Sequence, residues 1–274
     1  MIPSGRTFYK MSGSGNDFVV VDARQEPPNG LDRPETVQAV CARGTGVGAD
    51  GVVFLEPSRT AAYRIRYLNA DGTLAALCGN ATLCSARLAV ELGGADRGGF
   101  SIETDAGILP ARFVEGRPEI DLEPISEVVV DDKRVRLGDG ESRSGFVLAG
   151  VPHVVIRVAD LAAVDVVGRG GPIRRDPSFR QGANVNFVAD GGTTGTWRMR
   201  TYERGVEAET LACGTGAVAA AILLNAWGEA ASTVQIETRS GQMLRVRLGR
   251  EGARWLPSLS GDARIVYHGA FGEI

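Results

Sequence analysis

The chain has 274 residues, of which 43% are hydrophobic and 23% charged, a composition typical of a globular protein with one large or two medium domains. Its formal net charge is -3 and it has no block of Lys or Arg, which argues against nucleic acid as a partner. The longest apolar run, residues 217–224, is too short for a membrane span.

Hydropathy periodicity predicts short strands alternating with helices. Strands are expected, in chain order, over residues 17–22, 51–56, 64–68, 153–158, 184–190 and 198–202. Helices are expected over 35–44, 77–93 and 212–228, of which the last two end at Gly93 and Gly228. The third helix is apolar on every face, so it should run through a core rather than lie on one.

The two halves of the chain resemble each other. Five segments recur in order at an offset of 134 or 135 residues: 15–21 with 150–156, 49–56 with 183–190, 63–72 with 197–206, 78–81 with 213–216, and 101–107 with 235–241. Ordered matches at a nearly constant offset are the signature of an internal repeat. We therefore predict an α+β fold of two pseudo-symmetric lobes, each a mixed β-sheet or barrel wrapped around a central helix. The lobes are expected over 1–123, together with 261–274, and over 124–260.

Cys78 and Cys213 occupy equivalent positions in the repeat. Each is followed by Gly and then by a residue that can cap a helix, Asn80 or Thr215. Backbone N–H groups at a helix start stabilise a thiolate and can also bind a carboxylate. One thiolate can remove an α-proton while a second, protonated thiol delivers a proton to the opposite face. The pair therefore favours inversion of an amino-acid α-carbon over inert packing. Cys84, inside a predicted helix, and Cys41 are predicted core residues.

Metal and nucleotide sites are not favoured. The chain has two histidines, His153 and His268, and its four cysteines lack the short paired spacing of zinc ligands. The glycine-rich segment 44–51 follows a helical pattern and precedes a strand, the reverse of a dinucleotide-binding turn. We expect neither a metal nor an organic cofactor. Since the cysteines form no paired framework and the N-terminus has no signal-peptide core, we expect a cytoplasmic protein.

Polar residues at predicted strand ends are candidates for substrate binding: Asn16, Asn69, Asn184, Glu203 and Arg204. The dipeptide Glu203-Arg204 can bind an ammonium and a carboxylate, with Arg offering bidentate contact. Alternatively, it is a surface ion pair. His153 follows Pro152 and precedes an apolar strand; it either tunes a thiol or is a satisfied core histidine.

These motifs resemble the diaminopimelate epimerases, which are PLP-independent amino-acid epimerases. The similarity extends from residue 10 to about residue 220 and, through the IET segments and GDARIVYHGAF, to the C-terminus. Its most specific parts are NADG followed by CGN, and YERG followed by ETLACGTG. The resemblance implies interconversion of L,L- and meso-diaminopimelate, in lysine and peptidoglycan biosynthesis, by an isomerase that needs no cofactor.

The resemblance also implies a role for each candidate residue. Cys78 and Cys213 would be the acid–base pair, supported by His153 and Glu203. Backbone N–H groups of Gly79, Asn80, Gly214 and Thr215 would hold the reacting carboxylate. Asn16, Asn69, Asn184, Glu203 and Arg204 would bind the rest of a small amino-acid substrate. The sequence leaves open whether the protein forms a homodimer.

The chain departs from the family pattern at three positions. Val151 stands where the family usually has Asn, which removes one hydrogen bond to the distal end of the substrate. After Asn80, the chain has Ala81 in place of Gly and Leu83 in place of Arg.

Two other functions are compatible with the motifs. One is a racemase of the same fold acting on proline, hydroxyproline or histidine. Asn80 argues against the proline branch, where the first turn reads Cys-Gly-His, and Arg204 favours a substrate with a second charged terminus. The other is a non-catalytic small-molecule binding protein, against which the retention of both cysteines argues.

Overall fold

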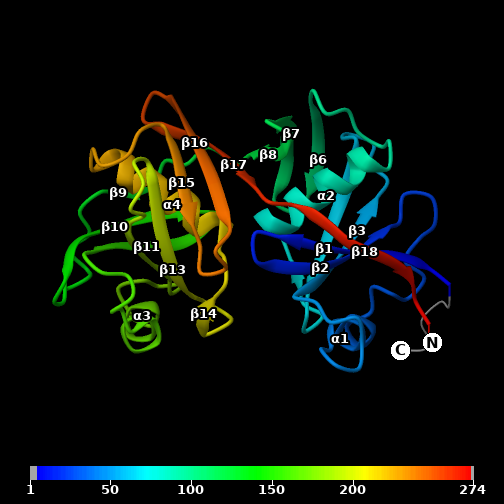
Figure 1. Ribbon diagram of the computed structural model, residues 1–274, viewed down its shortest axis with the longest axis horizontal. Helices are drawn as coiled ribbons and strands as arrows, with labels where there is room; N and C mark the ends of the chain where they lie inside the picture. Colours follow the sequence, from blue (N-terminus) through cyan, green and yellow to red (C-terminus); the bar gives the residue numbers. More distant parts are fainter. Residues whose placement is uncertain (1–4, 273–274) are drawn as a thin grey trace. The chain divides into compact units, whose positions relative to one another are not determined.

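The computed structural model describes residues 5–272, which form two compact units (Figure 1). The first unit runs to Asp121 and takes in the segment from Ser260 onward. The second unit comprises Leu122–Leu259. Among the described residues, no helix is both long and apolar enough to cross a membrane.

The first unit is a mixed sheet with two helices. Its strands pair in the order β18–β1–β2–β3–β4–β6–β7–β8, with β5 beside β4. Its elements are β1 (Thr7–Gly13), β2 (Asn16–Asp22), α1 (Pro34–Cys41), β3 (Gly51–Glu56), β4 (Tyr63–Asn69), β5 (Leu74–Ala75), α2 (Gly79–Glu91), β6 (Phe100–Thr104), β7 (Gly107–Val114), β8 (Arg117–Asp121) and β18 (Arg264–Ala270).

The second unit has the same organisation. Its strands pair in the order β9–β10–β11–β12–β13–β15–β16, with β14 beside β13. Its elements are β9 (Val128–Val129), β10 (Glu141–Ala149), β11 (Val151–Val158), α3 (Val166–Arg174), β12 (Asn184–Asp190), β13 (Thr196–Glu203), β14 (Ala208–Thr210), α4 (Gly214–Ala226), β15 (Thr233–Glu237), β16 (Met243–Glu251) and β17 (Arg254–Gly261), which reaches the first unit.

Strand pairing follows the sequence repeat. The run β2–β3–β4–β6–β7 alternates parallel, antiparallel, parallel and antiparallel pairs. The run β11–β12–β13–β15–β16 repeats that alternation. The prediction of an α+β fold with duplicated mixed sheets is therefore confirmed.

One helix of each unit is buried inside the curve of its sheet. Ten residues of α4 are buried, and the helix packs against β10, β11, β12 and β16 (Figure 1). The helix α2 packs in the same way against β1, β2, β3, β4, β8 and β18. Its buried residues include Leu83, in the position that the family pattern gives to Arg. The fully apolar sequence of residues 217–224 thus correctly predicted a helix through a core.

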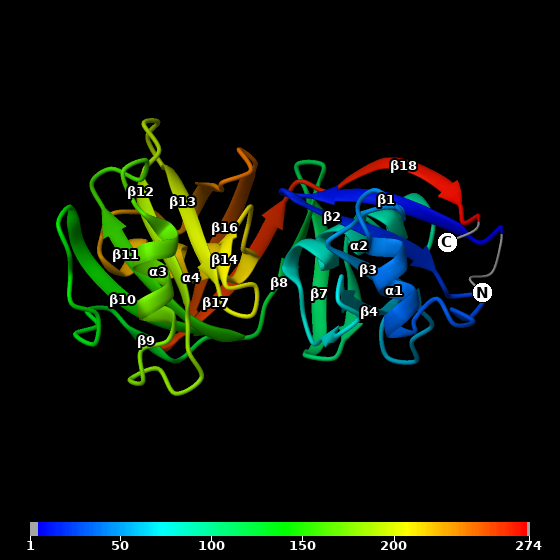
Figure 2. The same ribbon diagram turned by 90° about the horizontal axis from the view of Figure 1, so that it is seen from below.

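A second helix covers the outer face of each sheet (Figure 2). Side chains along β2 and β11 alternate between the two helices: Val19 and Val21 join the cluster of α1, and Val154 and Ile156 join the cluster of α3. The sequence did not predict α3, because it contains three glycines and Pro172. Gly170 is required there, since a Cβ would lie 2.6 Å from Cβ of Tyr202 on β13.

Candidate active site

Cys78 and Cys213 have the same backbone setting in the two units. Each is the N-cap of its buried helix, with φ and ψ of -133° and 113° at Cys78 and of -136° and 108° at Cys213. The first intrahelical hydrogen bonds run from Thr82 N to Cys78 O at 2.9 Å and from Ala217 N to Cys213 O at 3.0 Å. The N–H groups of the three residues after each cysteine therefore precede the helical ladder, where they can hold an anion.

The prediction that Asn80 or Thr215 caps these helices is wrong. The helices begin at Gly79 and Gly214, so Asn80 and Thr215 lie inside the first turn and the cysteines are the caps. A sequence pattern places helix ends only to within a few residues. The correction moves each thiol closer to the first N–H groups of its helix.

In the first unit, three polar side chains connect the start of α2 to the sheet. Asn80 is 2% exposed and donates from Nδ2 to Oδ1 of Asn16 at 2.7 Å. Asn16 in turn donates to Oδ2 of Asp50 at 3.0 Å. The Oδ1 atom of Asn80 is buried and, among the described residues, has no hydrogen-bond partner. A buried acceptor of this kind costs about 1–3 kcal/mol, which a ligand with an N–H or O–H group can recover.

Asn69 is the last residue of β4, which is separated from β2 by β3 in the same sheet. Its Nδ2 donates to Oγ1 of Thr73 in the β4–β5 turn at 3.0 Å. The next residue, Ala70, donates its N–H to the carbonyl oxygen of Asp50 at 3.0 Å. Asp50 thus joins the turns that carry Asn16 and Asn69, a role that the sequence analysis missed.

In the second unit, a chain of polar contacts leads from the thiol into the protein. The Sγ of Cys213 lies 3.7 Å from Oγ1 of Thr215, which lies 3.0 Å from Nε2 of His153. The Nδ1 of His153 faces Nδ2 of Asn186 at 3.2 Å. Asn186 Oδ1 accepts a hydrogen bond from Thr201 Oγ1 at 2.9 Å. His153, Asn186 and Thr201 are at most 2% exposed, so these three residues of the polar chain are buried. Thr215, which lies next to the thiol, is half-buried.

His153 is therefore a buried neutral imidazole. Burial, together with the positive charge of Arg204, lowers the pKa of His153 to about 3. The ring is a core histidine with hydrogen-bond partners, and its Nε2 lies 3.0 Å from Oγ1 of Thr215; that it tunes a thiol stays a prediction. At neutral pH it acts as a hydrogen-bond group and carries no charge.

Three predicted binding residues lie near the ends of β12 and β13. Asn184 is buried and its Oδ1 accepts the backbone N–H of Arg204 at 2.7 Å. The Nη1 of Arg204 donates to the carbonyl oxygen of Gln181 at 2.8 Å. Burial raises the pKa of Glu203 above its ordinary value. Neither of these two hydrogen bonds of Arg204 is to an acid, so the described residues give no support to the alternative of a Glu203–Arg204 ion pair.

The two remaining cysteines are core residues, as predicted. Cys84 is 0% exposed, and burial raises its pKa well above the ordinary value. Cys41 packs in the cluster beneath α1, and burial raises its pKa to about 11. Thiols of this kind are poor nucleophiles and poor bases at neutral pH. No disulfide joins the four cysteines, all of which the structure describes.

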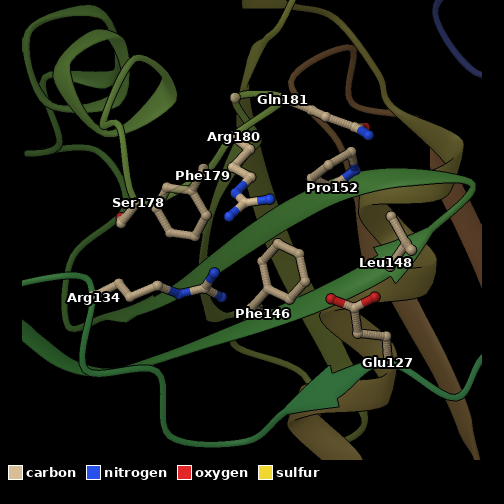
Figure 3. Close-up of a pocket in the computed structure, with 10 residues that line it drawn as sticks. Glu127, Arg134, Phe146, Leu148, Pro152, Ser178, Phe179, Arg180 and Gln181 are labelled. Carbon is tan, nitrogen blue, oxygen red and sulfur yellow. The ribbon is translucent and has the colours of Figure 1, made fainter.

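A pocket of about 320 Å³ lies on the second unit, outside the group of predicted site residues (Figure 3). Its apolar part is the stacked pair Phe146 and Phe179, over which the guanidinium of Arg134 lies at 4.6 and 4.4 Å. The pocket is lined by Pro152 and Gln181, so it adjoins His153 and the carbonyl partner of Arg204 without containing a thiol. Within residues 5–272, no group of three His, Cys, Asp or Glu side chains is placed to bind a metal.

Sequence reasoning missed Asn186, Thr201 and Asp50. An available signal was the polar Asn186 in the otherwise apolar strand NVNFVAD, because buried amides need hydrogen-bond partners. Alternation along β12 sends Val185 and Phe187 to the cluster of α3, which turns Asn186 toward α4.

Gly216→Ala is expected to lower the stability of the second unit by about 1–2 kcal/mol. The new Cβ would lie 2.4 Å from Oδ1 of Asn186 and 3.2 Å from Sγ of Cys213. Overpacking costs about 1–3 kcal/mol and outweighs the helix preference of Ala over Gly, which is worth up to about 1 kcal/mol. Ala81 occupies the equivalent position of α2, so the helix turn itself accepts a Cβ. Thermal unfolding measures the change, and an unchanged or raised Tm would contradict this packing.

Comparison with known proteins places the chain in a family. The family model for diaminopimelate epimerase matches residues 8–122 and 145–266. The chain is 45% identical over 273 residues to the diaminopimelate epimerase of Gemmatimonas aurantiaca, covering 96% of this chain and 98% of that protein. It is 39% identical over 281 residues to the diaminopimelate epimerase of Archaeoglobus fulgidus, covering 96% and 95%.

Solved structures share the fold at low sequence identity. A PhzF-family phenazine biosynthesis protein from Bacillus anthracis matches with a TM-score of 0.72 and 17% identity, covering 97% of this chain and 99% of that one. A hydroxyproline epimerase from Agrobacterium vitis matches with a TM-score of 0.68 and 17% identity, covering 98% and 92%. These likenesses concern the fold alone, whereas the family match and the curated relatives extend over nearly the whole chain. The chain belongs to the diaminopimelate epimerase family.

Proposed function

We propose that the protein interconverts L,L- and meso-diaminopimelate, with Cys78 and Cys213 as the two bases. The observation that carries the proposal is the equivalence of the two thiols, each at the N-cap of a buried helix with nearly identical backbone angles. A one-base enzyme or a binding protein requires no such duplication. The curated relatives named as diaminopimelate epimerases support the substrate.

In the proposed reaction, one cysteine as thiolate removes the proton from the α-carbon and leaves the electron pair on that carbon. The other cysteine, as thiol, donates its proton to the opposite face and becomes the thiolate. The configuration is inverted and the two thiols exchange protonation states, so atoms and charge balance without a metal or an organic cofactor. N–H groups of Gly79, Asn80, Gly214 and Thr215 would hold the reacting carboxylate and stabilise the developing negative charge.

The remaining predicted residues would bind and orient the substrate. Asn16, Asn69, Asn184 and Arg204 would read its polar groups, and Glu203 and His153 would support the thiols. Because the sequence has no paired cysteine framework, we place the reaction in the cytoplasm, in the route to lysine and peptidoglycan.

The test is proton exchange with solvent. When the reduced protein is incubated with L,L-diaminopimelate in heavy water, we expect deuterium at the inverted carbon together with formation of the meso isomer. Proline, hydroxyproline and histidine serve as parallel substrates and should incorporate none. Exchange confined to one of these three amino acids would favour the racemase alternative. If no amino acid exchanges under reducing conditions, the protein is not an epimerase of this type.

A further inference from the structure

The residue types of the polar chain that leads to Cys213 are not repeated at the equivalent positions of the first unit. In the repeat, His153, Asn186 and Thr201 correspond to Phe18, Val52 and Tyr67, so the first unit has no imidazole or amide at these positions. Phe18 and Tyr67 instead pack edge to face, with ring centroids 5.8 Å apart. Within the second unit, the polar chain leads to Cys213.

The orientation of the Asn186 amide is fixed by its neighbours. Its Nδ2 lies 3.0 Å from the carbonyl oxygen of Val154, which can only accept a hydrogen bond. Its Oδ1 lies 2.9 Å from the hydroxyl of Thr201, which can donate. Rotating the amide would place two oxygens face to face at Val154. The nitrogen of the amide therefore faces Nδ1 of His153, at 3.2 Å.

This orientation determines the protonation of His153. An amide nitrogen can only donate, so the Nδ1 that it faces carries no proton and acts as the acceptor. Because burial keeps the imidazole neutral, its single N–H is on Nε2. That N–H points to Oγ1 of Thr215 at 3.0 Å and donates to it. Since the hydroxyl oxygen already accepts this bond, its own proton is available to Sγ of Cys213, 3.7 Å away.

We propose that Asn186 is a positioning residue: it holds His153 in the Nε2–H form, which makes Thr215 a hydrogen-bond donor to Sγ of Cys213. The bond from Thr215 stabilises the thiolate of Cys213. This inference rests on the proposed role of Cys213 as a base. It also assigns His153 the role of a fixed donor, which does not take a proton from the thiol.

Nitrogen NMR of the imidazoles tests the first step. The chain has two histidines, so protein labelled with ¹⁵N-histidine gives one buried ring, His153, and one exposed ring, His268, as the reference. In the wild type, we expect Nε2 of His153 to carry the proton and Nδ1 to be bare. In Asn186→Asp at alkaline pH, where the carboxylate can only accept, we expect Nδ1 to be protonated. Wild-type protein with the proton on Nδ1, or an Asn186→Asp variant whose Nδ1 stays bare, would overturn the proposal.

Asn225→Asp is the matched control for the amide substitution. Asn225 is the single asparagine of α4 and donates from Nδ2 to the carbonyl oxygen of Ala230 at 2.9 Å, at the end of the helix away from Cys213. This variant changes an amide to a carboxyl in the same unit and should leave the proton of His153 on Nε2. If it moves the proton as Asn186→Asp does, the tautomer responds to added charge and the proposal fails.

Alkylation of individual thiols tests the final step. Iodoacetamide labelling at neutral pH, followed by peptide mass spectrometry, gives separate rates for Cys213 and Cys78 in one sample. Thr215→Val removes the hydroxyl and should slow the labelling of Cys213 by about tenfold, because hydrogen bonds to charged groups are worth about one pKa unit or more. Cys78 should be unaffected, and Thr215→Ser should restore the rate at Cys213. Equal rates at Cys213 in Thr215→Val and wild type would refute the donor role.

Both readouts are independent of turnover, so the two proposals fail separately. If wild-type protein shows the Nε2–H form and the expected labelling but no exchange in heavy water, the proposed function is wrong and the hydrogen-bond chain stands. If exchange occurs but the tautomer or the labelling differs from expectation, only the role of Asn186 is wrong.

Discussion

Cys78→Ala and Cys213→Ala are each expected to lower kcat for epimerisation by about a thousandfold or more. A positioned acid or base contributes roughly 10²–10⁴ in rate, and removing either member of a unit that acts together removes most of the effect of both. The proposed chemistry needs one thiolate and one thiol in every turnover, so the double variant should be little slower than either single variant. Chiral chromatography of the meso isomer formed over time measures the loss of kcat.

Cys84→Ala is the matched control for these variants. Cys84 lies in the same helix as Cys78, is fully buried, and has a pKa well above the ordinary value because of burial. Its replacement should preserve kcat and cost only stability. Retention of full activity in Cys78→Ala or Cys213→Ala would exclude the two-base scheme, while inactivity of Cys84→Ala at full folding would show that the helix, rather than its first thiol, is what matters.

The pH dependence of stability should depend strongly on His153. Its pKa is about 3 in the folded protein and about 6.5 in an unfolded chain. Above pH 6.5 the ring is neutral in both states, so it adds no pH dependence. As the pH falls from about 6.5 toward 3, the unfolded chain takes up a proton that the folded protein excludes. The free energy of unfolding should therefore fall by up to about 1.4 kcal/mol per pH unit from this residue alone.

Urea denaturation of wild type and His153→Gln between neutral and mildly acid pH measures this contribution. Glutamine does not titrate, so the variant should lose stability less steeply as the pH falls. The carboxyl groups that also titrate in this range are common to both proteins and cancel in the difference. His268→Gln, which removes the other histidine from the exposed part of β18, provides the comparison. Identical slopes for wild type and His153→Gln would mean that the ring is not buried as described.

The sequence by itself determined the repeat, the α+β class and the pairing of Cys78 with Cys213 at equivalent positions. The strands and the buried helix follow from short-range rules: strands alternate, and a helix that is apolar all round is buried. The constant offset of 134 or 135 residues then paired Cys78 with Cys213 and left Cys84 as a core residue. Short-range rules failed at α3, whose three glycines do not favour a helix, because Gly170 is needed to accommodate Tyr202 from β13.

Only the tertiary structure decided which polar groups meet the thiols. Asn186, Thr201 and His153 come from three different strands, and Thr215 comes from a helix, so no pattern along the chain records their contacts. The sequence by itself specified two equivalent cysteines at two helix starts. The structure shows that their surroundings differ, because strand pairing sets Asn186 against the imidazole of His153 in one unit and packs Phe18 against Tyr67 in the other. A hydrogen bond depends on positions within about 3 Å in space, and such positions exist only once the sheet has formed.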